Sequence, residues 1–478
     1  NLLKPTQAQL EHAWELHFGS VVFESYGFAP RCAIDAEAMN AAIKAGASAA
    51  EISDLRESMS MNRNATNERE RKEFLDAFHA AGVTCIFQNT GEEGSDPMRL
   101  IKRLAHFTKA TDGMKPALSK VTTAEEIEAL KKAGHVGLCF TTNGVPLMQD
   151  WESVRDELRF IRIFHELGTR MMHVTYNRRN PLGDGAGEPH DGGLSDFGKA
   201  AIAEMNQIGV IADVAHSGWK TAFDAAKASS KPMVASHTTC CGVYEHFRGK
   251  PDDTIKAICD TGGLVGICCI PRFLGGKGDI TALLDHLDHL IKKFGPQHAA
   301  IGCDTAYVSR FEKEERAKLM KAPGGPADRW EHLWPKDDYK TTIEAEQSVS
   351  WSNWPLFTLG LVMRGHSDDV IRQIIGGNML RVLRANACGS LPLGADFGFE
   401  DAFGACWPVS AIFDPFTEFA DLVLGEADVL AGHHFGMGAA TLHGADEHAA
   451  IRILRHDVWA TAGAALKGRG LSGEIERR

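Results

Sequence analysis

The chain carries eight short apolar runs, each ended by polar residues and followed by a segment with helix-like patterning. Continuous apolar strands separated by helices are typical of a parallel sheet whose outer face is covered by helices. Eight such units predict a (β/α)8 TIM-type barrel. The runs are Arg31–Met39, Gly82–Asn89, Val136–Asn143, Arg170–Asn177, Gly209–His216, Pro232–His237, Leu264–Pro271 and His298–Asp304.

Glycines mark the boundaries between several predicted helices and the strands that follow them. Gly82 and Gly209 each stand between a helix-like segment and an apolar run, where a helix commonly ends. A doubly wound open sheet is the alternative architecture. The second strand-turn carries no GxGxxG motif, so a dinucleotide site has no support.

Three regions lie outside the eight units. Residues 1–30 predict a helical lead-in to a barrel at 31–390. Within the barrel, residues 309–342 are polar and rich in Lys, Glu, Pro and Gly, which predicts a long loop or lid after the eighth strand. Residues 391–478 predict a C-terminal helical extension with a charged tail.

Charge and composition exclude several classes of protein. The net charge is −12 with no Lys/Arg stripe, which argues against nucleic acid as a partner. No apolar stretch approaches the length of a membrane span. The 11 cysteines form no CxxC pair, so we expect reduced, buried thiols and a cytoplasmic protein. The sequence starts at Asn1 without a Met, so a removed leader peptide stays open.

Polar residues at the ends of the predicted strands indicate where the chemistry lies, because barrel active sites form at the carboxyl ends of strands. His216 and His237 end consecutive runs, and Asp304 ends the eighth. Imidazole is the commonest metal ligand, so this arrangement favours a metal or catalytic site. Two structural histidines bonded at the barrel rim are the alternative.

The chain resembles the membrane (renal) dipeptidase family of zinc peptidases over roughly residues 31–387. The resemblance rests on six segments in the family's order and spacing: DVAHSG (Asp213–Gly218), VASHTT (Val234–Thr239), RGKPDD (Arg248–Asp253), AIGCDT (Ala300–Thr305), HELGTRMMHVTYNRRNPLGDG (His165–Gly185) and IIGGNMLRVL (Ile374–Leu383).

The resemblance implies a role for four residues. The histidines that match His216 and His237 ligate the second zinc in the family. The arginine that matches Arg248 holds the substrate carboxylate, and the aspartate that matches Asp304 carries the catalytic proton near the first zinc. The resemblance also implies a homo-oligomer, such as a dimer.

Three positions depart from the family pattern. The family's first strand ends in Asp-x-His-x-Asp, which we align with Asp35–Met39, so that Glu37 and Met39 replace the two ligands of the first zinc. The bridging glutamate of the third strand aligns with Asn143. A neutral amide and a thioether are poor ligands for these metals, so the sequence predicts fewer than two metals per chain.

A single metal site is the remaining prediction, held by His216, His237 and a carboxylate from Glu37 or Asp304. Zn²⁺ in a three-ligand site open to water is favoured. Iron or manganese, or no metal with the histidines acting as acid and base, remain open alternatives.

The predicted function is hydrolysis of an amide-type bond in a small carboxylate-bearing compound. Asp304 and Glu37 are the predicted catalytic groups, and Arg248, Tyr176 and Asn143 are the predicted substrate contacts. Because a fold does not determine its chemistry, a lyase, an isomerase, a non-heme iron oxygenase and a metal-free pseudo-peptidase stay open.

Overall fold

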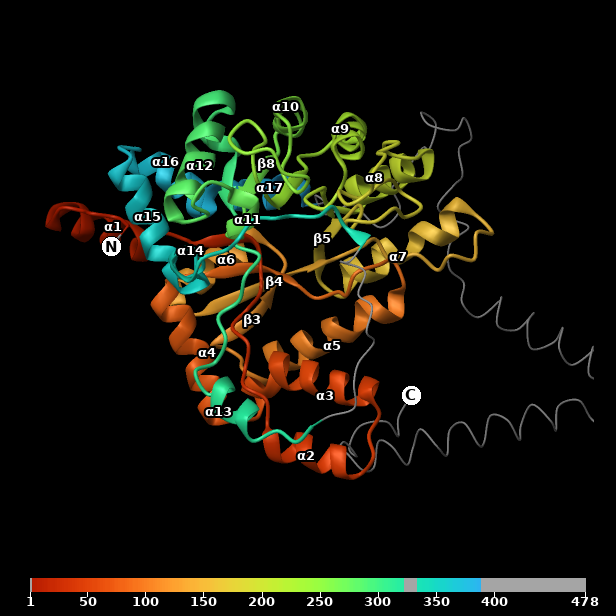
Figure 1. Cartoon of the computed structure of the whole chain (residues 1–478). Helices are drawn as coiled ribbons and strands as arrows, with labels where there is room; N and C mark the ends of the chain where they lie inside the picture. Colours follow the sequence, from red (N-terminus) through yellow and green to blue (C-terminus); the bar gives the residue numbers. More distant parts are fainter. Residues whose placement is uncertain (1, 322–332, 388–478) are drawn as a thin grey trace, which may run out of the picture. The chain divides into compact units, whose positions relative to one another are not determined.

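The computed structural model describes residues 2–321 and 333–387. Eight parallel strands follow one another around a sheet that closes towards a barrel, with helices on its outside (Figure 1). The eight strands are β1 (Phe23–Gly27), β2 (Cys85–Asn89), β4 (Val136–Thr142), β5 (Thr169–His173), β6 (Ile211–Asp213), β7 (Val234–Thr238), β8 (Leu264–Ile267) and β9 (Ala299–Ile301). The predicted barrel is confirmed.

The helices alternate with these strands along the chain. They are α1 (Gln7–Gly19), α2 (Ala36–Lys44), α3 (Ala49–Asn62), α4 (Glu68–Ala81), α5 (Pro97–Gly113), α6 (Ala124–Ala133), α7 (Val154–Glu166), α8 (Asp196–Ile208), α9 (Trp219–Ala228), α10 (Asp252–Asp260), α11 (Pro271–Leu274), α12 (Ile280–Phe294), α13 (Glu312–Ala317), α14 (Ile343–Ser348), α15 (Trp354–Met363), α16 (Asp368–Arg372) and α17 (Asn378–Asn386). Short 3-10 turns lie at Arg63–Ala65, Pro296–His298 and Trp351–Asn353, and a π-helical turn lies at Gln373–Gly377.

Local sequence signals explain the helix boundaries. Thr6 and Ser48 begin α1 and α3 with capping boxes, in which the cap side chain accepts from a backbone N–H of the first turn and the side chain of Gln9 or Glu51 accepts from the N–H of the cap. Gly82 and Gly209 end α4 and α8 in the left-handed conformation, with φ of 64° and 95°. Glycine adopts this conformation without a Cβ penalty, as the predicted boundaries require.

The barrel nearly closes between β9 and β1. The backbone N–H of Asp304, just beyond β9, lies 3.4 Å from the carbonyl of Tyr26 in β1. The N–H of Cys303 donates to the buried carboxyl of Glu24 at 3.0 Å. The amino-terminal ends of the strands are covered by α17, which packs in one apolar cluster with residues such as Phe23 and Val234. The opposite, carboxyl ends of the strands form the mouth.

The first strand was predicted at the wrong place. Residues Arg31–Met39 form a loop and the start of α2, whereas β1 is Phe23–Gly27, inside the predicted helical lead-in. The side chain of Asp35 accepts a hydrogen bond from the N–H of Ala38 and so caps α2. A capping aspartate followed by helix-forming residues favours a helix over a strand.

A further strand, β3 (Leu118–Val121), was not predicted. It pairs with the first half of β4, and β5 pairs with the second half. Both therefore share one edge of the longest strand of the barrel, and β3 lies off the circular strand order.

The structure describes residues 309–321 and 333–342 of the predicted lid; the first stretch contains α13, and the second contacts three loops at the mouth. Trp334 lies close to Gly187 in the loop after β5. Asp337 lies 3.2 Å from the ring of His246 in the loop after β7, and the Tyr339 hydroxyl donates to the carbonyl of Gly276 after β8. These contacts place the segment against the mouth side of the barrel.

The predicted extension at residues 391–478 lies outside the described residues. In residues 2–321 and 333–387, no helix combines the length and apolar character that a membrane crossing requires.

Candidate metal centre

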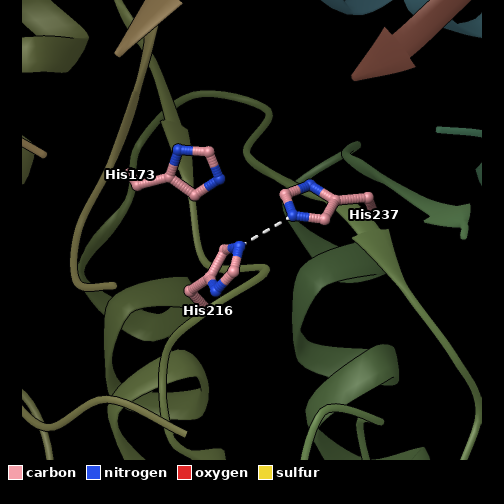
Figure 2. Close-up of side chains that lie close together, drawn as sticks. All are labelled: His173, His216 and His237. Carbon is pink, nitrogen blue, oxygen red and sulfur yellow. Dashed lines mark hydrogen bonds between the residues drawn. The ribbon is translucent and has the colours of Figure 1, made fainter. Parts of the chain in front are cut away.

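Three buried histidines meet at the mouth of the barrel (Figure 2). His173 is the last residue of β5, His216 follows β6, and His237 lies in β7. Each offers one ring nitrogen, and these nitrogens lie within 4.8 Å of one another. Across the described ranges 2–321 and 333–387, this is the group of histidine, cysteine and acidic side chains that is arranged to hold a metal ion.

The Nδ1 atoms of two of these histidines are held by oxygen acceptors. His173 Nδ1 donates to the carbonyl of Thr142 at 3.0 Å. His216 Nδ1 donates to Oδ1 of Asn177 at 2.9 Å. A neutral imidazole that donates through Nδ1 carries its lone pair on Nε2. Both rings therefore have the tautomer that a metal ligand needs.

His237 reaches the same tautomer through a buried chain of polar groups. The hydroxyl of Ser236 donates its single proton to the carboxylate of Asp213, which also accepts from the Ser236 backbone N–H at 3.0 Å. The Ser236 oxygen is therefore left to accept a hydrogen bond from His237 Nδ1, 2.9 Å away. His237 Nε2 then also carries a lone pair.

With their Nδ1 atoms donating, the three histidines have Nε2 atoms that lie close to other hydrogen-bond acceptors. The Nε2 atoms of His216 and His237 are 2.9 Å apart. Nε2 of His173 lies 3.1 Å from Asp213 Oδ2 and has no hydrogen-bond partner although it is buried. Two lone pairs at such a distance require a cation or a proton between them.

A proton is the weaker candidate for that place. Burial, followed by the nearby charge of Arg248, lowers the pKa of both His216 and His237 well below the usual range. Three imidazoles whose Nδ1 atoms are held by oxygen acceptors are a ligand set used by zinc in catalytic sites, where a fourth position stays open. The donor set therefore fits a single divalent metal.

Arg248 lies against this group from the loop after β7. Arg248 is 2% exposed, and its guanidinium donates to the carbonyl of Ala215. Nη2 lies 3.4 Å from both His216 Nε2 and the carbonyl of His237. Within the described residues, no carboxylate forms an ion pair with Arg248. The predicted substrate anchor is thus next to the histidines and has no carboxylate in direct contact among the described residues.

Asp304 lies at the mouth but outside the group of three histidines. It follows β9, and its backbone has a left-handed φ of 56°. Desolvation raises the pKa of its carboxyl to about 6, although the charges of Arg248, Arg272 and Arg31 act in the opposite direction. Strained backbone and a shifted pKa at a barrel mouth are typical of catalytic groups.

Glu37 does not belong to the centre. Its side chain is exposed in the first turn of α2, whereas the histidines are buried at the strand ends. The prediction that Glu37 ends the first strand is therefore wrong. The observed first strand, β1 at Phe23–Gly27, has the sequence FESYG and carries no Asp-x-His-x-Asp pattern.

A neutral pair of side chains, Tyr26 and Asn143, lies beside the histidines. The Tyr26 hydroxyl donates to Oδ1 of Asn143, 2.9 Å away, directly after β4. The Tyr26 ring stacks on His237 with the centroids 3.8 Å apart, and Tyr176 stacks in the same way on His216 at 4.0 Å. Glu37 and Met39 both lie in α2, so they do not stand at a strand end as expected, and the loss of the first-zinc and bridging ligands stays a prediction.

His173 was missed because the strand was expected to end later. The run Arg170–Asn177 pointed to Tyr176 and Asn177 as the strand end, but β5 stops at His173, which is paired with Asp213. A histidine inside an apolar run was the available signal. It was overlooked because apolar character continues beyond the last ladder hydrogen bond.

A family model described as membrane dipeptidase (peptidase family M19) matches residues 38–319, more than half of the chain. The chain belongs to this dipeptidase family. Members of peptidase family M19 are metal-dependent, and the three histidines could bind a metal.

Curated dipeptidases match this chain at low sequence identity. Over 269 residues the chain is 26% identical to the dipeptidase verJ of Clonostachys rogersoniana, a match that covers 56% of this chain and 59% of that protein. Over 346 residues it is 25% identical to the dipeptidase tcpJ of Claviceps purpurea, covering 70% and 68%. The chain thus spans less than two thirds of the first relative.

Solved structures share the fold. An amidohydrolase from Pseudomonas aeruginosa aligns with a TM-score of 0.56 and 23% identity, covering 78% of this chain and 98% of that one. A metallopeptidase from Rhodobacter sphaeroides, liganded with a phosphinate mimic of the dipeptide L-Ala-D-Ala, aligns with a TM-score of 0.53 and 16% identity, covering 77% and 100%.

Proposed function

We propose that this protein is a metal-dependent hydrolase that cleaves an amide-type bond in a small compound bearing a carboxylate. A single divalent metal, with zinc favoured, is held by His173, His216 and His237. The observation that carries the proposal is the pair of Nε2 atoms 2.9 Å apart, both left with lone pairs by their other hydrogen bonds. Membership of peptidase family M19 supports hydrolysis as the reaction.

The metal and Asp304 would have different roles in the hydrolysis. When bound, a divalent metal at such a site acts as a Lewis acid and makes water a better nucleophile near neutral pH. Asp304 accepts the proton of the attacking water and returns it to the leaving amine. Because its pKa is about 6, its carboxyl is mostly ionised at neutral pH yet is readily reprotonated.

Arg248 anchors the carboxylate of the substrate. Its guanidinium has five N–H donors, of which backbone carbonyls take only some. A buried cation without a carboxylate partner is costly, and a substrate carboxylate at this place would compensate it. Tyr176, stacked on His216 and partly exposed, lines the same space.

Metal content and hydrolysis together test the proposal. The chain is stripped of metal, titrated with zinc, cobalt, manganese or ferrous iron, and assayed on dipeptides and N-acyl amino acids. We expect one tightly bound metal per chain and release of a free amine. Glu37→Gln serves as a control and should keep both the bound metal and the hydrolytic activity.

Three outcomes would contradict the proposal. Two tightly held metals per chain would mean that the Tyr26–Asn143 side also binds metal. Iron with oxygen consumption would favour an oxygenase. Absence of metal would return the centre to acid–base chemistry or to ligand binding alone.

A further inference from the structure

Lys250 is a fully buried lysine two residues beyond Arg248, in the loop after β7. Its side chain is 0% exposed. In residues 2–321 and 333–387, no carboxylate forms an ion pair with it. Burying an ammonium group away from water is costly unless other groups compensate it. The polar contacts of Lys250 should therefore show what the residue does.

The ammonium group of Lys250 bonds the backbone on both sides of His216. Nζ donates to the carbonyl of Ser217 at 2.5 Å and to that of Ala215 at 3.4 Å. These two residues are the immediate neighbours of His216 in the chain. The side chain of Lys250 thus restrains the loop that carries one histidine of the centre.

The backbone of Lys250 is tied to the segment that carries another histidine. Its N–H donates to the carbonyl of Thr239 at 2.9 Å, and its carbonyl accepts from the N–H of Cys241 at 2.9 Å. Thr239 lies two residues beyond His237, just after β7. One residue therefore connects the His216 loop, through its side chain, to the His237 segment, through its main chain.

A second cation supports the same arrangement from the side of the metal centre. Arg248 donates to the carbonyls of Ala215 and His237. Burial and the nearby charge of Arg248 lower the pKa of Lys250 to about 7. An apolar side chain would fill this place without such a penalty, so the presence of a lysine requires a purpose beyond packing.

We propose that Lys250 is a positioning residue that sets the separation of His216 and His237, and through it the affinity of the three-histidine centre for a divalent metal. This inference rests on the proposed function. Lys250 does not touch the metal or the substrate in this scheme. It acts through the backbone carbonyls on either side of His216.

The test compares Lys250→Met with the wild-type chain in titrations of the metal-free protein with Co²⁺. Methionine has a similar length and no N–H donor. Loss of a group that orients a metal ligand typically costs about 10- to 100-fold in metal affinity, and we expect a loss of that size. The visible absorption bands of bound Co²⁺, which depend on ligand geometry, should also shift.

Stability separates positioning from a structural role. In Lys250→Met the carbonyl of Ser217 loses a donor, but a buried charge is also removed, and these effects oppose each other. We expect the melting temperature of the metal-free variant to stay near that of the wild type. Lys250→Gln keeps an N–H donor and should bind Co²⁺ more tightly than Lys250→Met. If Lys250→Met does not fold, the Co²⁺ affinity and spectrum of Lys250→Gln, compared with those of the wild type, test the positioning role.

Lys256→Met is the matched control, because Lys256 is exposed on α10 and pairs with Asp260. It should leave the Co²⁺ affinity unchanged. Wild-type affinity and spectrum in the Lys250 variants would overturn the inference and leave the proposed function standing. A wild-type chain that binds no metal would overturn the proposed function, and this inference with it.

Discussion

The two sides of the barrel mouth present different chemistry on the same scaffold. The side formed by β5, β6 and β7 carries three imidazoles whose Nδ1 atoms are all held by oxygen acceptors. The side formed by β1 and β4 carries a tyrosine bonded to an asparagine, with Phe28 just beyond. One side offers metal ligands, and the other offers a neutral hydrogen bond.

The two sides can differ in chemistry because the barrel and its mouth depend on different residues. The strand positions depend on apolar residues below the mouth, such as Phe23 and Val234, which pack in one cluster on both sides. The ligands are side chains at the strand ends, where substitution leaves that packing intact. Side chains at the mouth can therefore differ between the two sides while the barrel stays the same.

The largest effect is expected from His173→Ala, which removes one imidazole from the metal-binding side. Replacing a group that only orients a ligand already costs about 10- to 100-fold in metal affinity. We therefore expect the loss of a ligand to weaken metal binding by more than about 100-fold and to abolish most of the activity. Isothermal titration with Zn²⁺ and a turnover assay measure both.

The matching change on the neutral side is Asn143→Ala. Its effect on metal affinity should be far smaller, because Asn143 bonds Tyr26 and no histidine. Equal losses of affinity in the two variants would contradict the contrast between the two sides.

A second prediction concerns Asp304, which stands beside β1 on the side without ligands. Asp304 must be ionised to accept a proton, and its pKa is about 6. In the wild type, kcat/KM should therefore fall as the pH drops below about 6 and level off above it. Asp304→Asn should lower kcat/KM by roughly 10²-fold or more, the usual scale for a lost general base.

The pH profile of the Asp304→Asn variant provides the check. The limb near pH 6 should disappear from the residual activity. If that limb persisted in Asp304→Asn, another group would be the base, and the β1 side would contribute no chemistry.

The smallest effect is expected from Tyr26→Phe. The variant loses the hydrogen bond to Asn143 and leaves a buried acceptor unpaired, which costs about 1–3 kcal/mol of unfolding free energy. Its metal affinity should stay close to that of the wild type, because the phenyl ring can still stack on His237. Chemical denaturation measures the first value and a Co²⁺ titration the second. A large loss of metal affinity would mean that the hydroxyl itself belongs to the centre.

The sequence predicted seven of the eight barrel strands close to their observed places because each is a buried apolar run between helices. β1 was not predicted because Glu24 and Gly27 interrupt its apolar character. The burial of Glu24 also depends on partners that are distant in the sequence. Its carboxyl accepts from the indole of Trp351 at 2.8 Å and from the N–H of Cys303. Such long-range compensation of a buried acid is not visible in a local pattern.

The site was predicted in part for the same reason. His216, His237 and Arg248 lie in segments that match the family, and the structure brings them together. His173 also lies in a matching segment, His165–Gly185, but its place in the centre became clear only from the strand register that sets it opposite Asp213. Glu37 was wrongly included because the misplaced first strand carried the Asp-x-His-x-Asp alignment with it.

The stacked rings should make the conformation of the centre visible in NMR spectra. The chain has only 5 tyrosines, and two of them, Tyr26 and Tyr176, lie face to face with His237 and His216 at centroid distances of 3.8 and 4.0 Å. Ring currents at such distances displace the resonances of the facing protons. A sample labelled with ¹³C at tyrosine should therefore show two displaced signals that respond when the imidazoles turn, whether or not a substrate is known.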